Sequence, residues 1–155
     1  MVSGNRTTSL WISSHYGHPG SMTVGHGRLV VSTGVLVYHR LEVAYGYDTG
    51  FAFRPLSPDI LVGNDRFRVN FESNDLFLNF NILVHSRSGA TYSQMGKNVA
   101  PQQNQFSVDY PFSEFAVNPV NPGDVGTIIL IFQTGAIGSN DYAIRSLEAV
   151  NGDGA

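Results

Sequence analysis

The feature that most constrains the fold is a stretch at residues 66–86 in which an apolar side chain recurs at almost every second position. A period of two is typical of a β-strand with one buried face, because successive side chains point to opposite sides of the chain. The break Ser73-Asn74-Asp75 divides the stretch into two strands. We therefore expect a β-hairpin of half-buried strands whose inner face packs against a second sheet.

Similar alternation recurs along the rest of the chain, and no segment keeps a helical period over more than about ten residues. Turns rich in Gly, Pro and Asn separate the alternating segments, which is typical of β-sandwiches. The sequence therefore predicts an all-β protein, an antiparallel two-sheet β-sandwich, with a jelly roll as the expected version. Further strands are expected at residues 8–13, 22–24, 28–32, 35–45, 106–110, 124–133 and 141–150.

The segment 124–133, DVGTIILIFQ, is apolar on both faces. Such a segment is typical of a central strand that is covered on both sides. We predict that alternate residues of this strand are buried, and that the stretch at 66–86 faces them from the other sheet across the core. The residues concerned are Ile128, Leu130 and Phe132, faced by Phe80 and Ile82.

The chain of 155 residues has the length of one domain, enough to bury a core without disulfides or metal. We expect a single β-sandwich domain over residues 1–155, with a candidate N-terminal arm at 1–9 and a C-terminal tail at 151–155. The N-terminus lacks the charged and apolar regions of a signal peptide. We therefore expect a chain that is processed or virion-associated.

Charge is scarce, because charged residues make up only 14% of the chain and the net charge is −3. A single lysine, Lys97, is present, so no basic stripe is available to bind phosphates. Nucleic acid is therefore not an expected partner. No run of about 18 apolar residues occurs, which excludes insertion of a helix into a membrane. The absence of cysteine excludes disulfides and thiolate metal sites.

Four segments over residues ~66–150 resemble known families in their core and turn motifs. They are NDRFRVNFESNDLFLNFNILV, NQFSVDYPFSEF, GDVGTIILIFQTG and NDYAIRSLEAV. Their order resembles the β-sandwich domains of exported bacterial proteins with a PEP-CTERM-type sorting tag and, more loosely, the carbohydrate-binding jelly-roll modules. The resemblance implies a β-sandwich in a bacterial extracellular or cell-surface protein. The sorting tag itself is absent from this sequence.

Aromatic residues near polar ones are the candidate glycan ligands. Sugar binding commonly uses a planar ring against the pyranose face, together with fixed hydrogen-bonding side chains. Tyr45, Tyr47 and Asp48, in AYGYDTG, fit this requirement in type, and Trp11 is the single tryptophan. The alternative is that a tyrosine at a strand end only anchors its ring in the core.

Two groups of residues are candidate metal ligands. Asp124 and Asp141 fall in turns, and the jelly-roll modules resembled above often hold calcium with loop carboxylates, because calcium prefers six to eight oxygen ligands. His15 and His18 form the densest histidine cluster, in SSHYGHPG. Both groups also have an ordinary explanation, since Asp favours turns and a polar loop can contain histidines. We expect no cofactor, and calcium is the alternative.

We predict that the protein is not an enzyme. No Gly-x-Ser-x-Gly motif occurs, and no carboxylate stands in a context that suggests a raised pKa. A glycosidase-type pair such as Glu72 with Glu114 is an alternative that the sequence leaves open.

The expected function is that of an extracellular or surface structural protein that associates with itself as a matrix, filament or fibre subunit. Its strands are neutral and largely lack the Lys and Pro with which monomers discourage pairing between sheet edges. The expected partner is then a second copy of the chain. The alternatives are a glycan-binding, lectin-like module and a virion or phage-tail jelly-roll protein.

Overall fold

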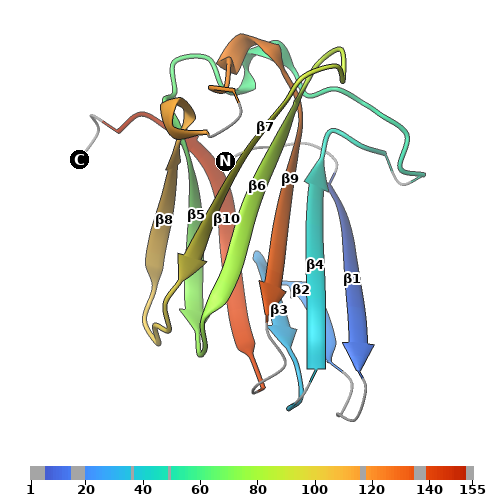
Figure 1. Ribbon diagram of the computed structural model, residues 1–155, viewed down its shortest axis with the longest axis vertical. Coiled ribbons are helices and arrows are strands. Elements are labelled where there is room, and N and C mark those ends of the chain that lie inside the picture. Colours follow the sequence, from blue (N-terminus) through green and yellow to red (C-terminus); the bar gives the residue numbers. More distant parts are fainter. Residues whose placement is uncertain are drawn as a thin grey trace.

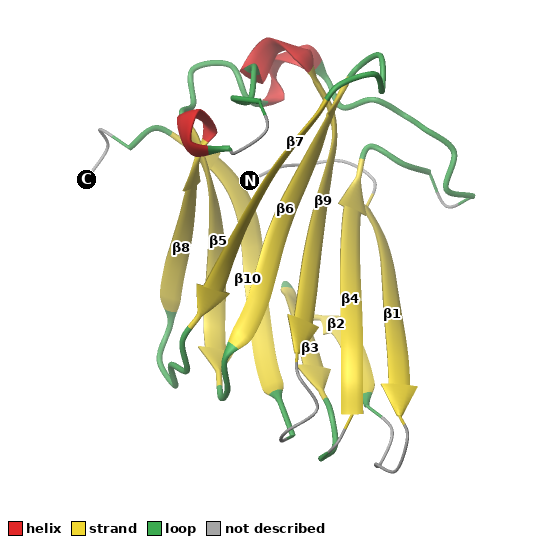
Figure 2. Cartoon of the chain, viewed as in Figure 1, coloured by secondary structure: helices red, strands yellow, loops and turns green. Residues whose placement is uncertain are grey.

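The computed structural model describes the main β-sheet framework of the chain, namely residues 6–14, 20–35, 37–48, 50–115, 118–134 and 139–152. Two antiparallel five-stranded sheets lie face to face, with their strands along the long axis of the molecule (Figure 1). Short 3-10 helices gather at one end of the sandwich (Figure 2). No helix within these ranges is long and apolar enough to cross a membrane. The predicted antiparallel β-sandwich is confirmed.

Sheet A has the strand order β1-β4-β9-β6-β7, and sheet B has the order β2-β3-β10-β5-β8. Most consecutive strands alternate between the sheets, which is the connectivity of a jelly roll. The strands are β1 (Arg6–Ser14), β2 (Ser21–Gly25), β3 (Arg28–Ser32), β4 (Val37–Tyr45), β5 (Arg66–Asn74), β6 (Leu78–Ser86), β7 (Tyr92–Val99), β8 (Phe106–Pro111), β9 (Val125–Thr134) and β10 (Asp141–Val150). The 3-10 helices are η1 (Pro58–Ile60), η2 (Phe112–Glu114) and η3 (Pro122–Asp124).

The core lies between the sheets and is rich in aromatic rings. Phe80 and Phe132 are stacked, with ring centroids 4.2 Å apart, and Phe71 of sheet B meets both rings edge-on. All three side chains are buried, as are Ile82, Ile128 and Leu130. The predicted burial of these residues is therefore confirmed.

The predicted hairpin is wrong, because β5 belongs to sheet B and β6 belongs to sheet A. β6 instead pairs directly with β9, so that Phe80 lies beside Phe132 and Ile82 beside Leu130 in the same sheet. These residues do not face one another across the core. The alternation of apolar residues identifies the buried faces of β5 and β6 correctly, but it carries no information about which strand pairs with which.

β9 is a central strand of sheet A as predicted, but a second layer, sheet B, covers only its inner face. Ile129 and Ile131 point to the outer face and remain half-buried, with Ala44 of β4 and Leu83 of β6 as neighbours in the register. Apolar residues on both faces thus reflect contacts with neighbouring strands on the outer side, and not a third layer.

Part of the expected N-terminal arm is a strand of the chain's own sheet. β1 pairs along its whole length with β4, from Arg6 opposite Tyr45 to Ser14 opposite Val37. Residues 1–5 of the expected arm lie outside the described residues. At the other terminus, the backbone N–H of Gly152 donates to the Asp65 carboxylate, which fixes the first part of the expected tail.

Candidate functional site

The residues predicted to bind glycans do not form one site. Tyr45 is buried in the core, so the alternative role of core anchor applies to it. Trp11 pairs with Arg40 in the register, whereas Tyr45 pairs with Arg6. Five residues of β-strand separate these positions, a distance of roughly 17 Å.

Asp48 has a structural role in the loop after β4. Its carboxylate accepts hydrogen bonds from the backbone N–H groups of Ala52 and Gly50, at 2.9 Å each, which lower the pKa of the carboxyl. These bonds hold Phe51 at a positive φ of 61°, a conformation that costs energy for a bulky residue. Tyr47, half-buried in the same loop, meets Phe53 edge-on.

The predicted metal ligands are also separated. Asp124 precedes β9 and Asp141 begins β10, at opposite ends of the sandwich (Figure 1). The backbone N–H of Asp141 donates to the carboxylate of Asp75, whose pKa is raised by burial and by the charge of Asp141. Within the described ranges, no three acidic or histidine side chains gather where they could share a metal ion. His15 and His18 lie outside the described residues.

The two carboxylates of the glycosidase-type alternative, Glu72 and Glu114, are likewise not brought together. Glu72 on β5 forms an ion pair with Arg28 at 2.9 Å, on the outer face of sheet B. Glu114 lies in η2, which follows the end of β8. Arg66, near the start of β5, pairs with Pro111 at that end of β8, so Glu72 is six residues farther along β5.

A row of polar residues crosses the outer face of sheet A. Arg40, Gln133, Asn79 and Asn98 occupy neighbouring register positions on β4, β9, β6 and β7. The residues that flank them along each strand point into the core, so these four side chains point outward. We call this set the amide row.

Hydrogen bonds within the sheet hold the amides of this face in place. Asn79 Nδ2 donates to Asn98 Oδ1 at 3.1 Å, and Asn81 Nδ2 donates to Asn79 Oδ1 at 2.8 Å. Asn81 lies opposite Gly96, where a Cβ would collide with the Asn81 side chain. Glycine at position 96 therefore leaves room for the Asn81 amide on this face.

The face around the amide row combines compensated charge with exposed rings. Arg40 and Glu42 form an ion pair at 2.6 Å, so the guanidinium adds little net charge. Tyr38 lies two residues before Arg40 on the same face and is 51% exposed. Tyr92, at the start of β7 and six residues from Asn98, is 49% exposed on the same face of the sheet. Amides and tyrosine rings together are the groups that bind hydroxyl-rich ligands.

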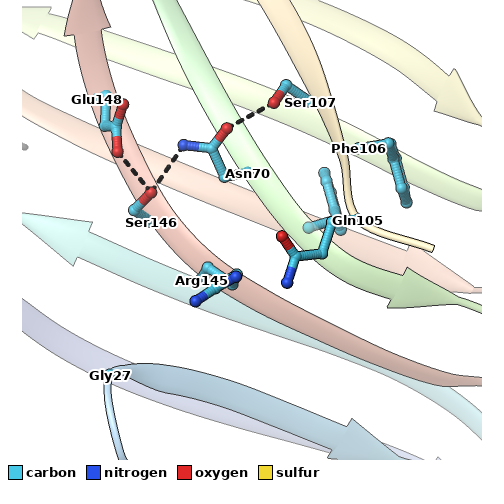
Figure 3. Close-up of a pocket in the computed structure, with 9 residues that line it drawn as sticks. Gly27, Asn70, Gln105, Phe106, Ser107, Arg145, Ser146 and Glu148 are labelled. Carbon is cyan, nitrogen blue, oxygen red and sulfur yellow. Dashed lines mark hydrogen bonds between the residues drawn. The ribbon is translucent and has the colours of Figure 1, made fainter.

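On the outer face of sheet B, Arg28, Arg66 and Arg68 are each paired with a carboxylate. Arg68 binds Asp109 with two hydrogen bonds, at 2.7 and 2.8 Å, and this contact lowers the pKa of Asp109. Arg66 binds Asp65 and also reaches Asp109. Beside this network lies a hollow of about 460 Å³ (Figure 3). Its lining includes Asn70 and Arg145.

Sequence reasoning missed the amide row as a site. The sequence contains part of the signal. Asn79 and Asn81 lie on the face of their strand opposite its apolar residues, and Arg40 and Glu42 do the same on another strand. The row forms only when the register brings four strands side by side, and β7 was not among the predicted strands.

Comparisons with known proteins show the fold. No protein-family model and no curated protein matches the chain. Among solved structures, the family 11 carbohydrate-binding module of the cellulosomal cellulase Lic26A-Cel5E of Clostridium thermocellum matches with a TM-score of 0.54 and 13% identity, over 95% of this chain and 86% of that chain. A structure of a family 11 module from the same organism, in complex with a β-1,3-1,4-mixed-linked tetrasaccharide, has a TM-score of 0.53 and 12% identity, over 95% and 88%.

A domain of bacteriophage CBA120 tailspike protein 4 also matches, with a TM-score of 0.50 and 11% identity, over 92% of this chain and 19% of that chain. Two of these neighbours are carbohydrate-binding modules, so the looser resemblance of the sequence to carbohydrate-binding jelly-roll modules is supported at the level of the fold. None of them supports the resemblance to PEP-CTERM-type proteins. At these identities the likeness concerns the fold alone.

Proposed function

We propose that the protein is a non-catalytic glycan-binding module that binds a neutral polysaccharide across the outer face of sheet A. The observation that carries the proposal is the amide row, in which Arg40, Gln133, Asn79 and Asn98 stand side by side on four strands. The carbohydrate-binding modules among the structural neighbours support the same class of function.

The chemistry of the row suits sugar hydroxyls. An amide offers both donors and acceptors, and a guanidinium offers donors only, so together they match hydroxyl groups that do both. The bonds among Asn79, Asn81 and Asn98 fix the orientation of these amides before a ligand arrives. Such preorganisation reduces the entropy that binding costs.

The shape of the face suits a chain of sugars. From β4 to β7 the row crosses three strand spacings, roughly 14 Å, which exceeds the width of a single pyranose ring. Ile129, Ile131 and Leu83 provide a half-buried apolar surface next to the row for the C–H faces of the sugars. A polysaccharide ligand also agrees with an extracellular or cell-surface location.

We expect Arg40→Ala and Gln133→Ala each to weaken binding to a neutral polysaccharide by about tenfold, because each removes hydrogen bonds worth roughly 1–2 kcal/mol. Affinity electrophoresis in gels that contain mixed-linkage β-glucan, xylan or galactan measures this loss. The panel begins with mixed-linkage glucan, since one neighbour was solved with such an oligosaccharide.

The matched control is Arg28→Ala, which also removes one arm of an exposed ion pair but lies on the opposite sheet. It should leave the mobility shift unchanged. Equal losses for Arg28→Ala and Arg40→Ala, or no loss for Arg40→Ala, would refute binding at the amide row.

Self-association stays a prediction. Lys97, on the edge strand β7, points inward, where its ammonium donates to the backbone carbonyl of Asp109 and lies 5.0 Å from the Tyr110 ring centroid. An inward-pointing charge is one of the ways in which proteins protect a sheet edge from pairing. Assembly through strand edges would therefore use β1 or β2 in preference to β7.

The structural interpretation expects oligomers or filaments, which light scattering at on the order of tens of micromolar would detect. A monodisperse monomer at this concentration contradicts that interpretation. Glycan binding requires no assembly, so this measurement separates the two functions.

A further inference from the structure

A β-bulge on sheet B presents Arg145 at the hollow. Ile144 pairs with Phe71 and Ser146 with Asn70, so two steps along β10 oppose one step along β5, and Arg145 is the extra residue. A bulge commonly re-aims a side chain, and bulges are frequent next to functional sites. Arg145 is exposed and lines the hollow together with Gln105 (Figure 3).

A chain of hydrogen bonds orders the floor of the hollow (Figure 3). Ser107 Oγ donates to Asn70 Oδ1 at 2.6 Å, and Asn70 Nδ2 donates to Ser146 Oγ at 2.8 Å. Ser146 Oγ in turn donates to Glu148 Oε1 at 2.9 Å. Each side chain is therefore held in one orientation across the three strands β8, β5 and β10.

The side chains of the floor retain hydrogen-bond donors and acceptors that a ligand can use. Asn70 retains its second N–H donor, Ser107 retains its lone pairs, and the second oxygen of Glu148 can accept from a hydroxyl. Phe106 lines the same hollow and provides an apolar surface. The volume of about 460 Å³ is within the range of small-molecule sites.

The charge of Arg145 sets this hollow apart from the rest of the face. Arg28, Arg66 and Arg68 are each paired with a carboxylate. Arg145 makes no hydrogen bond or ion pair with any residue that the structure describes. Its guanidinium is thus available to a carboxylate that a ligand brings, in the bidentate geometry that such pairs prefer.

We propose that this hollow binds a uronate residue of an acidic glycan, with the sugar carboxylate on Arg145 and the ring hydroxyls on Asn70, Ser107 and Glu148. Glu148 does not oppose the ligand carboxylate, because it lies three residues farther along β10, about 10 Å from Arg145. Figure 3 shows the two side chains on either side of Ser146. The site lies on the opposite sheet from the amide row and is independent of the proposed function.

Isothermal titration calorimetry of the whole chain with trigalacturonate tests the proposal. We expect Arg145→Ala to weaken binding at least about tenfold, because it removes charge-assisted hydrogen bonds. Arg145→Lys should give an intermediate loss, since it keeps the charge and loses the planar fork. Binding should also weaken as salt is raised, because salt screens exposed charges.

Arg54→Ala is the matched control, because it removes the same charge from the exposed loop after β4. It should leave trigalacturonate binding unchanged. Wild-type affinity in Arg145→Ala, with its circular dichroism intact, overturns the proposal. Equal affinity for galactotriose, or full displacement by equimolar acetate, overturns the assignment to a uronate.

The two sites can fail separately. Loss of mixed-linkage glucan binding in Arg40→Ala concerns the amide row alone, and loss of trigalacturonate binding in Arg145→Ala concerns the hollow alone. A chain that binds trigalacturonate but no neutral polysaccharide would retain the site proposed here and exclude the function proposed for sheet A.

Discussion

Replacing Phe132 by alanine should lower the free energy of unfolding by about 3–5 kcal/mol, the usual loss for a core phenylalanine. The Phe132 ring is fully buried, stacks on Phe80 at a centroid distance of 4.2 Å, and also contacts Phe71 and Tyr142. Truncation leaves a cavity between two sheets that are each fixed by their own hydrogen bonds, so the surroundings cannot collapse fully. Urea unfolding measures the loss as a lower midpoint with an unchanged m-value.

The control is Phe77→Ala, since Phe77 is 71% exposed at the connection between β5 and β6. Its expected effect is within about 0.5 kcal/mol, as for most surface substitutions. Phe132→Leu should cost less than Phe132→Ala, because it leaves a smaller cavity. Similar losses for Phe77→Ala and Phe132→Ala would contradict the packing of the core.

The inner faces of the strands could be predicted from the sequence, because burial imposes a local period of two. The partner of a strand could not. Phe80 and Phe132 are far apart in sequence, and their contact depends on the connection at residues 75–77, which carries the chain from sheet B to sheet A. A turn rich in polar residues was compatible with a hairpin as well as with a crossing between sheets.

The sequence does not predict β7, because the inward-facing positions of this strand are not regularly apolar. Ser93, Met95, Lys97 and Val99 alternate toward the core, and only two of these four are apolar. An edge strand can place a serine or a lysine inward, since the lysine ammonium reaches the backbone of the opposite sheet. Missing this strand also concealed Asn98, the last member of the amide row.

The hollow was beyond sequence reasoning for a different reason. In DYAIRSLEAV nothing distinguishes Arg145 from an ordinary outward-facing residue of an alternating strand. Its position as the extra residue of a bulge follows from the pairing of β10 with β5. The side chains that form the floor of the hollow come from three strands that lie far apart in the sequence. A site of this kind depends on register, which no local pattern records.

We expect the free energy of unfolding to decrease as the pH falls from about 6.5 to 4, because the buried imidazole of His39 resists protonation in the folded chain. The imidazole is buried between the sheets, with Nε2 2.9 Å from the Tyr142 hydroxyl and Nδ1 2.7 Å from Thr134 Oγ1. Burial lowers the pKa of His39 to about 4. The unfolded chain, with a histidine pKa of about 6.5, therefore binds a proton throughout this window while the folded chain does not.

The stability contributed by the neutral imidazole is fully present above pH 6.5 and is lost as the pH falls toward 4, by up to roughly 3 kcal/mol. Urea unfolding at half-unit steps of pH measures the loss. His39→Gln removes the titrating group and keeps a side chain that can donate and accept hydrogen bonds, so its stability should vary less across the window, even where its absolute stability is lower.

The carboxyl groups with shifted pKa values do not produce the same loss of stability between pH 6.5 and 4. The lowered pKa values of Asp48, Asp65 and Asp109 remove stability only below the ordinary pKa of aspartate, at about 4. Asp75, whose pKa is raised, acts with the opposite sign, because its folded form binds a proton more readily than its unfolded form. All four are present in wild type and in His39→Gln, so the difference between the two profiles isolates the imidazole. Parallel profiles between pH 6.5 and 4 would show that His39 becomes protonated without cost, and would contradict its burial as a neutral link between the sheets.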